Sequence, residues 1–443
     1  MEGFGQYGFT LAIIGFFTVI SEFGLNPVQI RETSINRDSD LPRRYISLTL
    51  LARTILGCIS LAIIVAVAIF ANKPDDVRLL LILLGAGMFV TNLFGSYSAV
   101  LMGLEKLESF AVFSALYSLG FTVLAIAALK LGFGLVGIGV SQLSVGLIIT
   151  VAGVLYVTHK VMKPLGGIDF PKGIEIFKMA APLGLTAVLT AIYYRANFII
   201  LSYMRGDMEV GYLNAAYTIS NTLLLFATTF SGSLLPRLSS LFVNDYETLG
   251  KIYRTAFKYL VFVGIGSAFG AVALAKPVIE FLFGEQFMPG ATALSILIWG
   301  SALMFANSLQ GNMLVASNKK RELVHMTGVA AAANIALNFL LIPPYGIGGA
   351  ALAMVVSEAI TGIWSFVLLR RHNPPATLLA IIIKSILASL LMILAIISIP
   401  MLHVAYRVVI GIAAYAVGLV VFRGFDAADI KIIRNLAGVG ASR

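Results

Sequence analysis

Long apolar stretches, separated by short polar connections, recur along the whole chain. Most of them hold about 20 residues or more, the length that an α-helix needs to cross the hydrocarbon core of a bilayer. The alternation of apolar and polar positions that is typical of a membrane β-barrel is absent from the sequence. The pattern predicts an all-α polytopic membrane protein with thirteen helices, at residues 5–30, 45–71, 78–101, 110–130, 135–158, 177–203, 210–235, 253–275, 291–315, 323–343, 347–369, 377–400 and 406–423.

The composition agrees with this pattern. Hydrophobic residues make up 59% of the 443 residues and charged residues 12%, with a mean hydropathy of +0.95. Soluble domains carry about 25% charged residues, so this chain would form a poor aqueous surface. The connections are too short to hold a soluble catalytic domain, and the four histidines are scattered without metal-ligand spacing. We therefore expect neither an enzyme nor a metal site.

The basic residues lie mainly on one side of the predicted helices. Loops after the odd-numbered helices, together with the C-terminal tail, hold 20 Lys and Arg, and the opposite side holds 6. This bias predicts a multi-pass protein of the cell (plasma or inner) membrane with a cytoplasmic C-terminus. The basic residues behind the net charge of +10 then set the orientation in the membrane and attract anionic lipids. Nucleic acid is not an expected partner.

One sequence pattern within the predicted membrane helices occurs twice. Tyr7 and Pro27 of the first copy match Tyr212 and Pro236 of the second, at offsets of 205 and 209 residues. Further along, Ser141-Gln142 matches Ser357-Glu358 at an offset of 216. Duplicated apolar halves are typical of transporters whose substrate binds between the halves.

The repeat also predicts the domain organisation. We expect an N-terminal bundle over 1–160, a C-terminal bundle over 161–375, and a helix pair with a cytoplasmic tail over 376–443. Helix 177–203 precedes the second copy, and its counterpart would precede Met1. The repeat thus predicts a fourteen-helix plan from which one N-terminal helix is missing. The alternative is a family that lacks this helix.

Several short motifs, in their order along the chain, resemble the polysaccharide transporter branch of the multidrug/oligosaccharidyl-lipid/polysaccharide exporter superfamily, the Wzx-type flippases. These are residues 181–184 (APLG), 193–197 (YYRAN), 210–217 (VGYLNAAY), 277–284 (PVIEFLFG), 289–291 (PGA) and 346–351 (GIGGAA). The resemblance implies two pseudo-symmetric helical bundles around a central cavity. It also implies alternating access that moves a polyprenyl-(di)phosphate-linked oligosaccharide to the outer leaflet. Relatives often have an acid where this chain has Asn197, so a role for that acid is in doubt here.

Basic residues within the predicted helices are the candidates for the lipid headgroup. Arg53, Arg195 and Lys384 lie deep in their helices, where a cation costs about 2.5–3.5 kcal/mol on insertion scales and usually faces a cavity or a partner. Together they could bind a diphosphate, because Arg offers a planar fork and Lys a compact charge. The alternatives are an internal salt bridge for the arginines and snorkelling to the interface for Lys384.

Acidic and uncharged polar residues complete the candidate site. Glu22 and Glu358 could each bind a coupling ion, H⁺ or Na⁺, or neutralise a neighbouring arginine. Glu358 takes the repeat position of the neutral Gln142. Tyr194 and Asn197 could hydrogen-bond sugar hydroxyls, and the alternative for both is packing between helices.

Three other functions stay open at this point. A multidrug or cation antiporter of the same superfamily would be expected to have more acidic and fewer basic interior residues. A flippase for the peptidoglycan lipid precursor would also use a basic cavity. A membrane polymerase or ligase acting on lipid-linked sugars would need a larger outer loop than this chain has. The expected partners are the lipid-linked oligosaccharide, membrane lipids and other membrane proteins of polysaccharide assembly.

Overall fold

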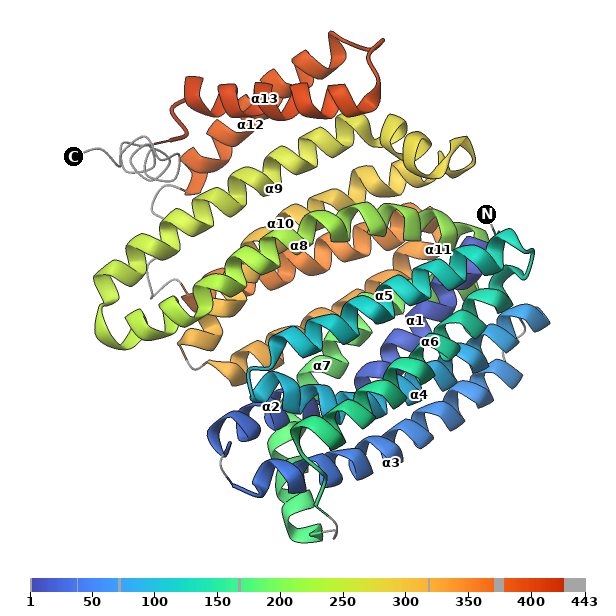
Figure 1. Ribbon diagram of the computed structural model, residues 1–443. Helices are drawn as coiled ribbons and strands as arrows, with labels where there is room; N and C mark the ends of the chain where they lie inside the picture. Colours follow the sequence, from blue (N-terminus) through green and yellow to red (C-terminus); the bar gives the residue numbers. More distant parts are fainter. Residues whose placement is uncertain are drawn as a thin grey trace. The chain divides into compact units, whose positions relative to one another are not determined.

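The computed structural model describes residues 2–37, 39–70, 73–165, 169–317, 319–369 and 378–425, and this part of the chain contains helices and no strands (Figure 1). The α-helices are α1 (Glu2–Glu22), α2 (Leu25–Ile35), α3 (Leu41–Phe70), α4 (Asp75–Gly103), α5 (Leu107–Lys130), α6 (Gly134–Tyr156), α7 (Phe170–Arg205), α8 (Asp207–Asn244), α9 (Tyr246–Phe283), α10 (Gly290–Ala316), α11 (Lys320–Leu369), α12 (Leu378–Ile397) and α13 (Val404–Val421). Two short helical turns, Val157–Val161 and Glu285–Phe287, follow α6 and α9.

Twelve helical segments among the described residues are long and apolar enough to cross a membrane. They confirm the predicted all-α membrane fold. The count differs from thirteen because the predicted helices 323–343 and 347–369 run together in α11, which breaks at Gly346 (φ 53°, ψ −130°). The first predicted helix, in turn, is divided into α1 and α2.

The helices form two compact units, Glu2–Ile199 and Ile200 to the end of the described chain. In the first unit, α4 is the central helix and packs against α1, α2, α3 and α6. In the second unit, α10 is central and packs against α8, α9 and α11, while α12 packs against α9 and α13. The bundle boundaries at residues 160 and 375 stay predictions from the sequence.

Equivalent glycine contacts recur inside the two units and follow the sequence repeat. In the first unit, a Cβ at Gly57 of α3 would lie 2.7 Å from the ring of Phe89 in α4. In the second unit, a Cβ at Gly264 of α9 would lie 3.4 Å from the Cβ of Phe305 in α10. The glycine pair is offset by 207 residues and the phenylalanine pair by 216. In both units a glycine of one helix thus lies against the next helix of the repeat near a phenylalanine, although the nearest atoms at Gly264 belong to the backbone of Ala302.

The chain turns sharply between α1 and α2, at Phe23 (φ 40°) and Gly24 (φ 71°). A Cβ on Gly24 would lie 2.6 Å from the backbone nitrogen of Gly184 and 2.7 Å from the carbonyl oxygen of Ala180, both in α7. Pro182, between them, interrupts the hydrogen bonding of α7. The α1–α2 turn thus packs against the backbone of α7 at and next to the APLG motif of residues 181–184.

We expect Gly24→Ala to lower the midpoint of thermal unfolding in detergent more than Gly134→Ala does. Both glycines have positive φ, so an alanine is strained at either position by about 1–2 kcal/mol. Only at Gly24 would the added Cβ also meet backbone, because nothing lies within 4 Å of a Cβ at Gly134. Equal midpoints for the two variants would show that the contact with α7 contributes nothing.

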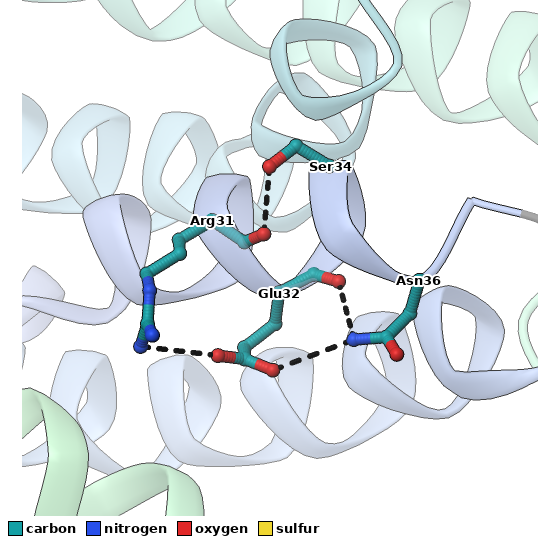
Figure 2. A network of polar contacts seen from close by, with 4 residues as sticks. All are labelled: Arg31, Glu32, Ser34 and Asn36. Atoms are coloured by element: carbon teal, nitrogen blue, oxygen red, sulfur yellow. Dashed lines mark hydrogen bonds and ion pairs between the residues drawn. The ribbon is translucent and has the colours of Figure 1, made fainter.

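Polar contacts close the end of α2, as Figure 2 shows. The side-chain nitrogen of Asn36 donates to the carbonyl oxygen of Glu32 (2.9 Å), and the Ser34 hydroxyl donates to the carbonyl oxygen of Arg31 (2.7 Å). Arg31 and Glu32 form an ion pair at 3.4 Å. The backbone nitrogen of Asn36 also donates to the Glu32 carbonyl (3.2 Å), so these side-chain bonds reinforce the last turn of α2.

The loop that follows α2 is paired with the loop that follows α4. Arg37 donates to the carboxylate of Glu105, and this hydrogen bond together with the arginine charge lowers the pKa of Glu105. Because this pKa is lowered, the pair stabilises the folded state at pH values above the ordinary pKa of a glutamate. This stabilisation is lost as the pH falls through the lowered pKa. Because the Glu105 side chain is exposed, the pair adds little to stability.

Candidate functional site

Arg53 of α3 is buried inside the first unit, with 1% of its surface exposed. Its Nη1 donates to the side-chain oxygen of Asn92 (2.6 Å) and to the backbone oxygen of the same residue (3.2 Å). Its Nη2 donates to the side-chain oxygen of Asn26 (2.6 Å), whereas Nε has no hydrogen-bond partner. The guanidinium is therefore bonded to neutral amides of α2 and α4.

Further polar groups of α2, α3 and α4 are bonded to one another near this arginine. Glu22 is the last residue of α1, and no carboxylate of the described residues lies within ion-pair distance of the guanidinium. One turn away, Gln29 donates to the backbone of Ser96 (2.8 Å) and accepts from Thr49 (3.0 Å). A polar seam thus joins α2, α3 and α4, and a headgroup role for Arg53 stays a prediction.

Arg195 of α7 is only partly buried and lies against Gly15 of α1. Tyr194, also partly buried, makes an edge-to-face contact with Tyr193 at 5.1 Å between ring centroids. Asn197 is fully buried, and its side-chain oxygen accepts from the backbone nitrogen of Phe198 (3.0 Å). The sequence-predicted residues of α7 therefore differ in access: Tyr194 and Arg195 are partly exposed, and Asn197 is covered.

Lys384 lies in α12, in the second unit. Its Nζ donates to the carbonyl oxygen of Arg423 (2.8 Å), just after the end of α13. A lysine in this place stabilises a helix C-terminus, where carbonyl groups lack partners and the dipole is negative. This contact agrees with the alternative in which Lys384 reaches towards the membrane surface. A role of Lys384 in substrate binding stays a prediction.

Glu358 of α11 is buried, with 4% of its surface exposed. The side-chain nitrogen of Asn307 in α10 donates to its carboxylate (2.7 Å) and to its backbone oxygen (3.0 Å). The repeat places Thr91 and Gln142 of the first unit at the corresponding positions. A buried carboxylate with an amide donor thus occurs in the second unit, where the first has neutral groups.

Sequence reasoning missed the amides and glycines that hold these charged side chains. Asn26, Asn92 and Asn307 each lie within a predicted membrane helix, and that position was the available signal, because polar side chains in membranes usually bond across helices. Gly15 and Gly95, which contact the two arginines, stand among 42 glycines and carried no signal of their own.

The second unit also contains an apolar cavity of about 580 Å³. Helices α8 and α9 form one wall, and the C-terminal pair α12 and α13 forms another. The lining is almost entirely apolar, with Ile219, Leu274, Met392 and Ile412 among its residues. Such a cavity suits a hydrocarbon chain and offers little to a sugar.

Together, these features define a multi-pass helical membrane protein of the transporter class, built from two repeated units with charged groups inside its spans. The family model described as "Polysaccharide biosynthesis protein" matches residues 1–242, more than half of the chain. The chain belongs to this polysaccharide biosynthesis protein family.

Curated relatives agree with this placement, and a solved structure shows the same fold. The chain is 23% identical over 367 residues to a putative O-antigen transporter of Shigella dysenteriae. This alignment covers 81% of this chain and 90% of the relative. It is 25% identical over 190 residues to the capsular polysaccharide biosynthesis protein CapF of Staphylococcus aureus, covering 42% of this chain and only about half (47%) of that protein. The fold is similar to the lipid II flippase MurJ in an inward closed conformation, with TM-score 0.74, 16% identity and coverage of 95% and 97%.

Proposed function

We propose that the protein flips a polyprenyl-(di)phosphate-linked oligosaccharide from the cytoplasmic to the outer leaflet, for cell-surface polysaccharide biosynthesis. Alternating access between the two units would move the headgroup without any change in its mass, so no catalytic residues are assigned. The observation that carries the proposal is Arg195, a partly exposed cation within a membrane helix of a polysaccharide biosynthesis protein. The name of the O-antigen transporter supports the same substrate class.

The chemistry of the headgroup matches the residues of α7. A diphosphate presents oxygens that the planar fork of Arg195 can bind in a bidentate manner. Tyr194 is placed next to it and can donate a hydrogen bond to a sugar hydroxyl. Arg53, Lys384 and Asn197 belong to the proposal as further headgroup contacts, which would require a change in the contacts that they make here.

A coupling ion is part of the same proposal. Glu358 and Glu22 are the candidates for binding H⁺ or Na⁺. The buried position of the Glu358 carboxylate beside Asn307 supports Glu358 as the site. Ion binding would bias the populations of the inward and outward states. The cell membrane, with the C-terminus in the cytoplasm, is the proposed location, and membrane lipids and other polysaccharide-assembly proteins are the proposed partners.

The direct test is headgroup accessibility in proteoliposomes that contain a fluorescent polyprenyl-diphosphate sugar. Protein-dependent movement of the headgroup across the bilayer is the expected result, with no elongation or cleavage of the sugar by mass spectrometry. A change in substrate mass would favour a polymerase or ligase. Absence of movement, together with exchange of organic cations for H⁺ or Na⁺, would favour an antiporter.

We expect Ser267→Trp to slow the transfer of a long-chain polyprenyl substrate several-fold. Ser267 lines the apolar cavity, so an indole there would occupy space that we propose for part of the isoprenoid chain. The slowing should be smaller for a substrate with a short prenyl chain. The control is Val272→Trp, at an exposed position of α9 outside the cavity lining. Equal slowing of the long and short substrates would show that the cavity does not hold the chain.

A further inference from the structure

Both membrane arginines of the first unit lie against a glycine of a neighbouring helix. A Cβ on Gly95 of α4 would overlap Nη1 of Arg53, and its distance from Cζ would be 2.8 Å. A Cβ on Gly15 of α1 would lie 3.1 Å from Cζ, 3.1 Å from Nε and 3.2 Å from Nη2 of Arg195. Any side chain at either glycine would therefore compete with the guanidinium for space.

The two contacts differ in geometry. At Gly15 the three nearest guanidinium atoms are almost equally distant, which places the added Cβ over the face of the group. A point in the plane of the guanidinium would be clearly nearer to some of these atoms than to others. The guanidinium of Arg195 therefore lies flat on the backbone of α1, and its face is covered there while its N–H groups point along the plane.

The two arginines also differ in access. Arg53 is 1% exposed, whereas Arg195 is partly exposed. A guanidinium that is held by one face keeps its N–H groups in a fixed plane, and bidentate phosphate binding uses two parallel N–H groups of that plane. The bare backbone at Gly15 sets both the height and the tilt of that plane.

We propose that Gly15 is a positioning residue for the headgroup, acting through Arg195. The proposal rests on the proposed function. Gly15 supplies a flat, side-chain-free surface in the interior of α1, and Arg195 rests on it with its donors aligned for the (di)phosphate. A methyl group at this position displaces the guanidinium by a few tenths of an ångström, and a branched side chain removes it from the contact.

The experiment is a double-mutant cycle in the proteoliposome transfer assay with the fluorescent polyprenyl-diphosphate sugar. Gly15→Ala is expected to raise the half-saturating substrate concentration several-fold, and Gly15→Val is expected to raise it about as much as Arg195→Ala does. In the Arg195→Ala background, Gly15→Val is expected to add no further change, since the displaced group is gone. Thermal midpoints should not fall for Gly15→Ala, because alanine favours a helix interior over glycine.

The matched control is Gly232→Val, in the interior of α8, where nothing lies within 4 Å of an added Cβ. It should leave the half-saturating concentration unchanged. An equal effect of Gly15→Val in the wild-type and Arg195→Ala backgrounds would overturn the proposal, because it would show a role in packing. Wild-type transfer with no effect of either Gly15 variant would also overturn it while keeping the proposed function. Absence of wild-type transfer would instead contradict the proposed function.

Discussion

Arg195→Ala is expected to weaken the apparent affinity for a polyprenyl-diphosphate sugar by about 10- to 100-fold. Charge-assisted hydrogen bonds contribute about 1.5–3 kcal/mol each, and about 1.4 kcal/mol corresponds to a tenfold change in affinity. Arg195→Lys should fall between wild type and alanine, since lysine keeps the charge but loses the planar fork. The measurement is initial transfer rate against substrate concentration in proteoliposomes with equal amounts of inserted protein.

The control for Arg195 lies on the same helix. Lys178 of α7 is exposed near the start of the helix, where its charge can reach the membrane surface. Lys178→Ala should leave transfer unchanged. If Arg195→Ala transfers as fast as wild type at every substrate concentration, Arg195 is not part of the headgroup site, although a flippase could still be correct.

The second large effect concerns the buried arginine. Asn92→Leu should destabilise the first unit by about 1.5–3 kcal/mol, because it removes a hydrogen-bond partner of a buried charge and leaves that charge in place. Arg53 would lose its 2.6 Å hydrogen bond to the Asn92 side chain. The carbonyl oxygen of Ser21 would lose the hydrogen bond that it accepts from the Asn92 amide. The expected observation is a fall in the thermal midpoint in detergent and in the yield of folded protein.

A double variant separates the structural role of this arginine from a role in substrate binding. Arg53→Met with Asn92→Leu replaces the buried charge and its buried amide partner by apolar side chains, a change that can be nearly neutral. The other partner, Asn26, is only partly buried. The double variant should therefore unfold near the wild-type midpoint. Transfer by this variant would limit Arg53 to structure, and its loss from a folded protein would support the predicted headgroup role. A stable Asn92→Leu single variant would contradict the network described here.

Much of the fold could be predicted from local patterns, and the errors have physical causes. Two predicted helices merge in α11 because the chain continues helically on both sides of Gly346, and a φ of 53° at one residue breaks the axis without a polar loop. The predicted helix 5–30 divides at Gly24, where contact with the α7 backbone holds a left-handed turn. Neither event changes the hydropathy of the stretch, so neither was visible in the pattern.

The candidate site was predictable in its charged residues but not in their surroundings. Arg53, Arg195, Lys384, Glu22 and Glu358 stand out because charges are rare in apolar helices. Their partners do not stand out, because an asparagine or a glycine is unremarkable in a membrane helix until another helix packs against it.

The sequence by itself determined that this is a helical membrane protein with a duplicated plan, because span length, hydropathy and repeats are local properties of the chain. Only the tertiary structure decided which charges are buried and which are accessible. Arg53 became an internal group because Asn26 and Asn92, 27 and 39 residues away, come within 2.6 Å of it. Arg195 stayed partly exposed, and its guanidinium lies against Gly15 of α1, 180 residues away in the sequence. Such contacts depend on the packing of helices that are distant in the sequence, so no local pattern of the chain reveals them.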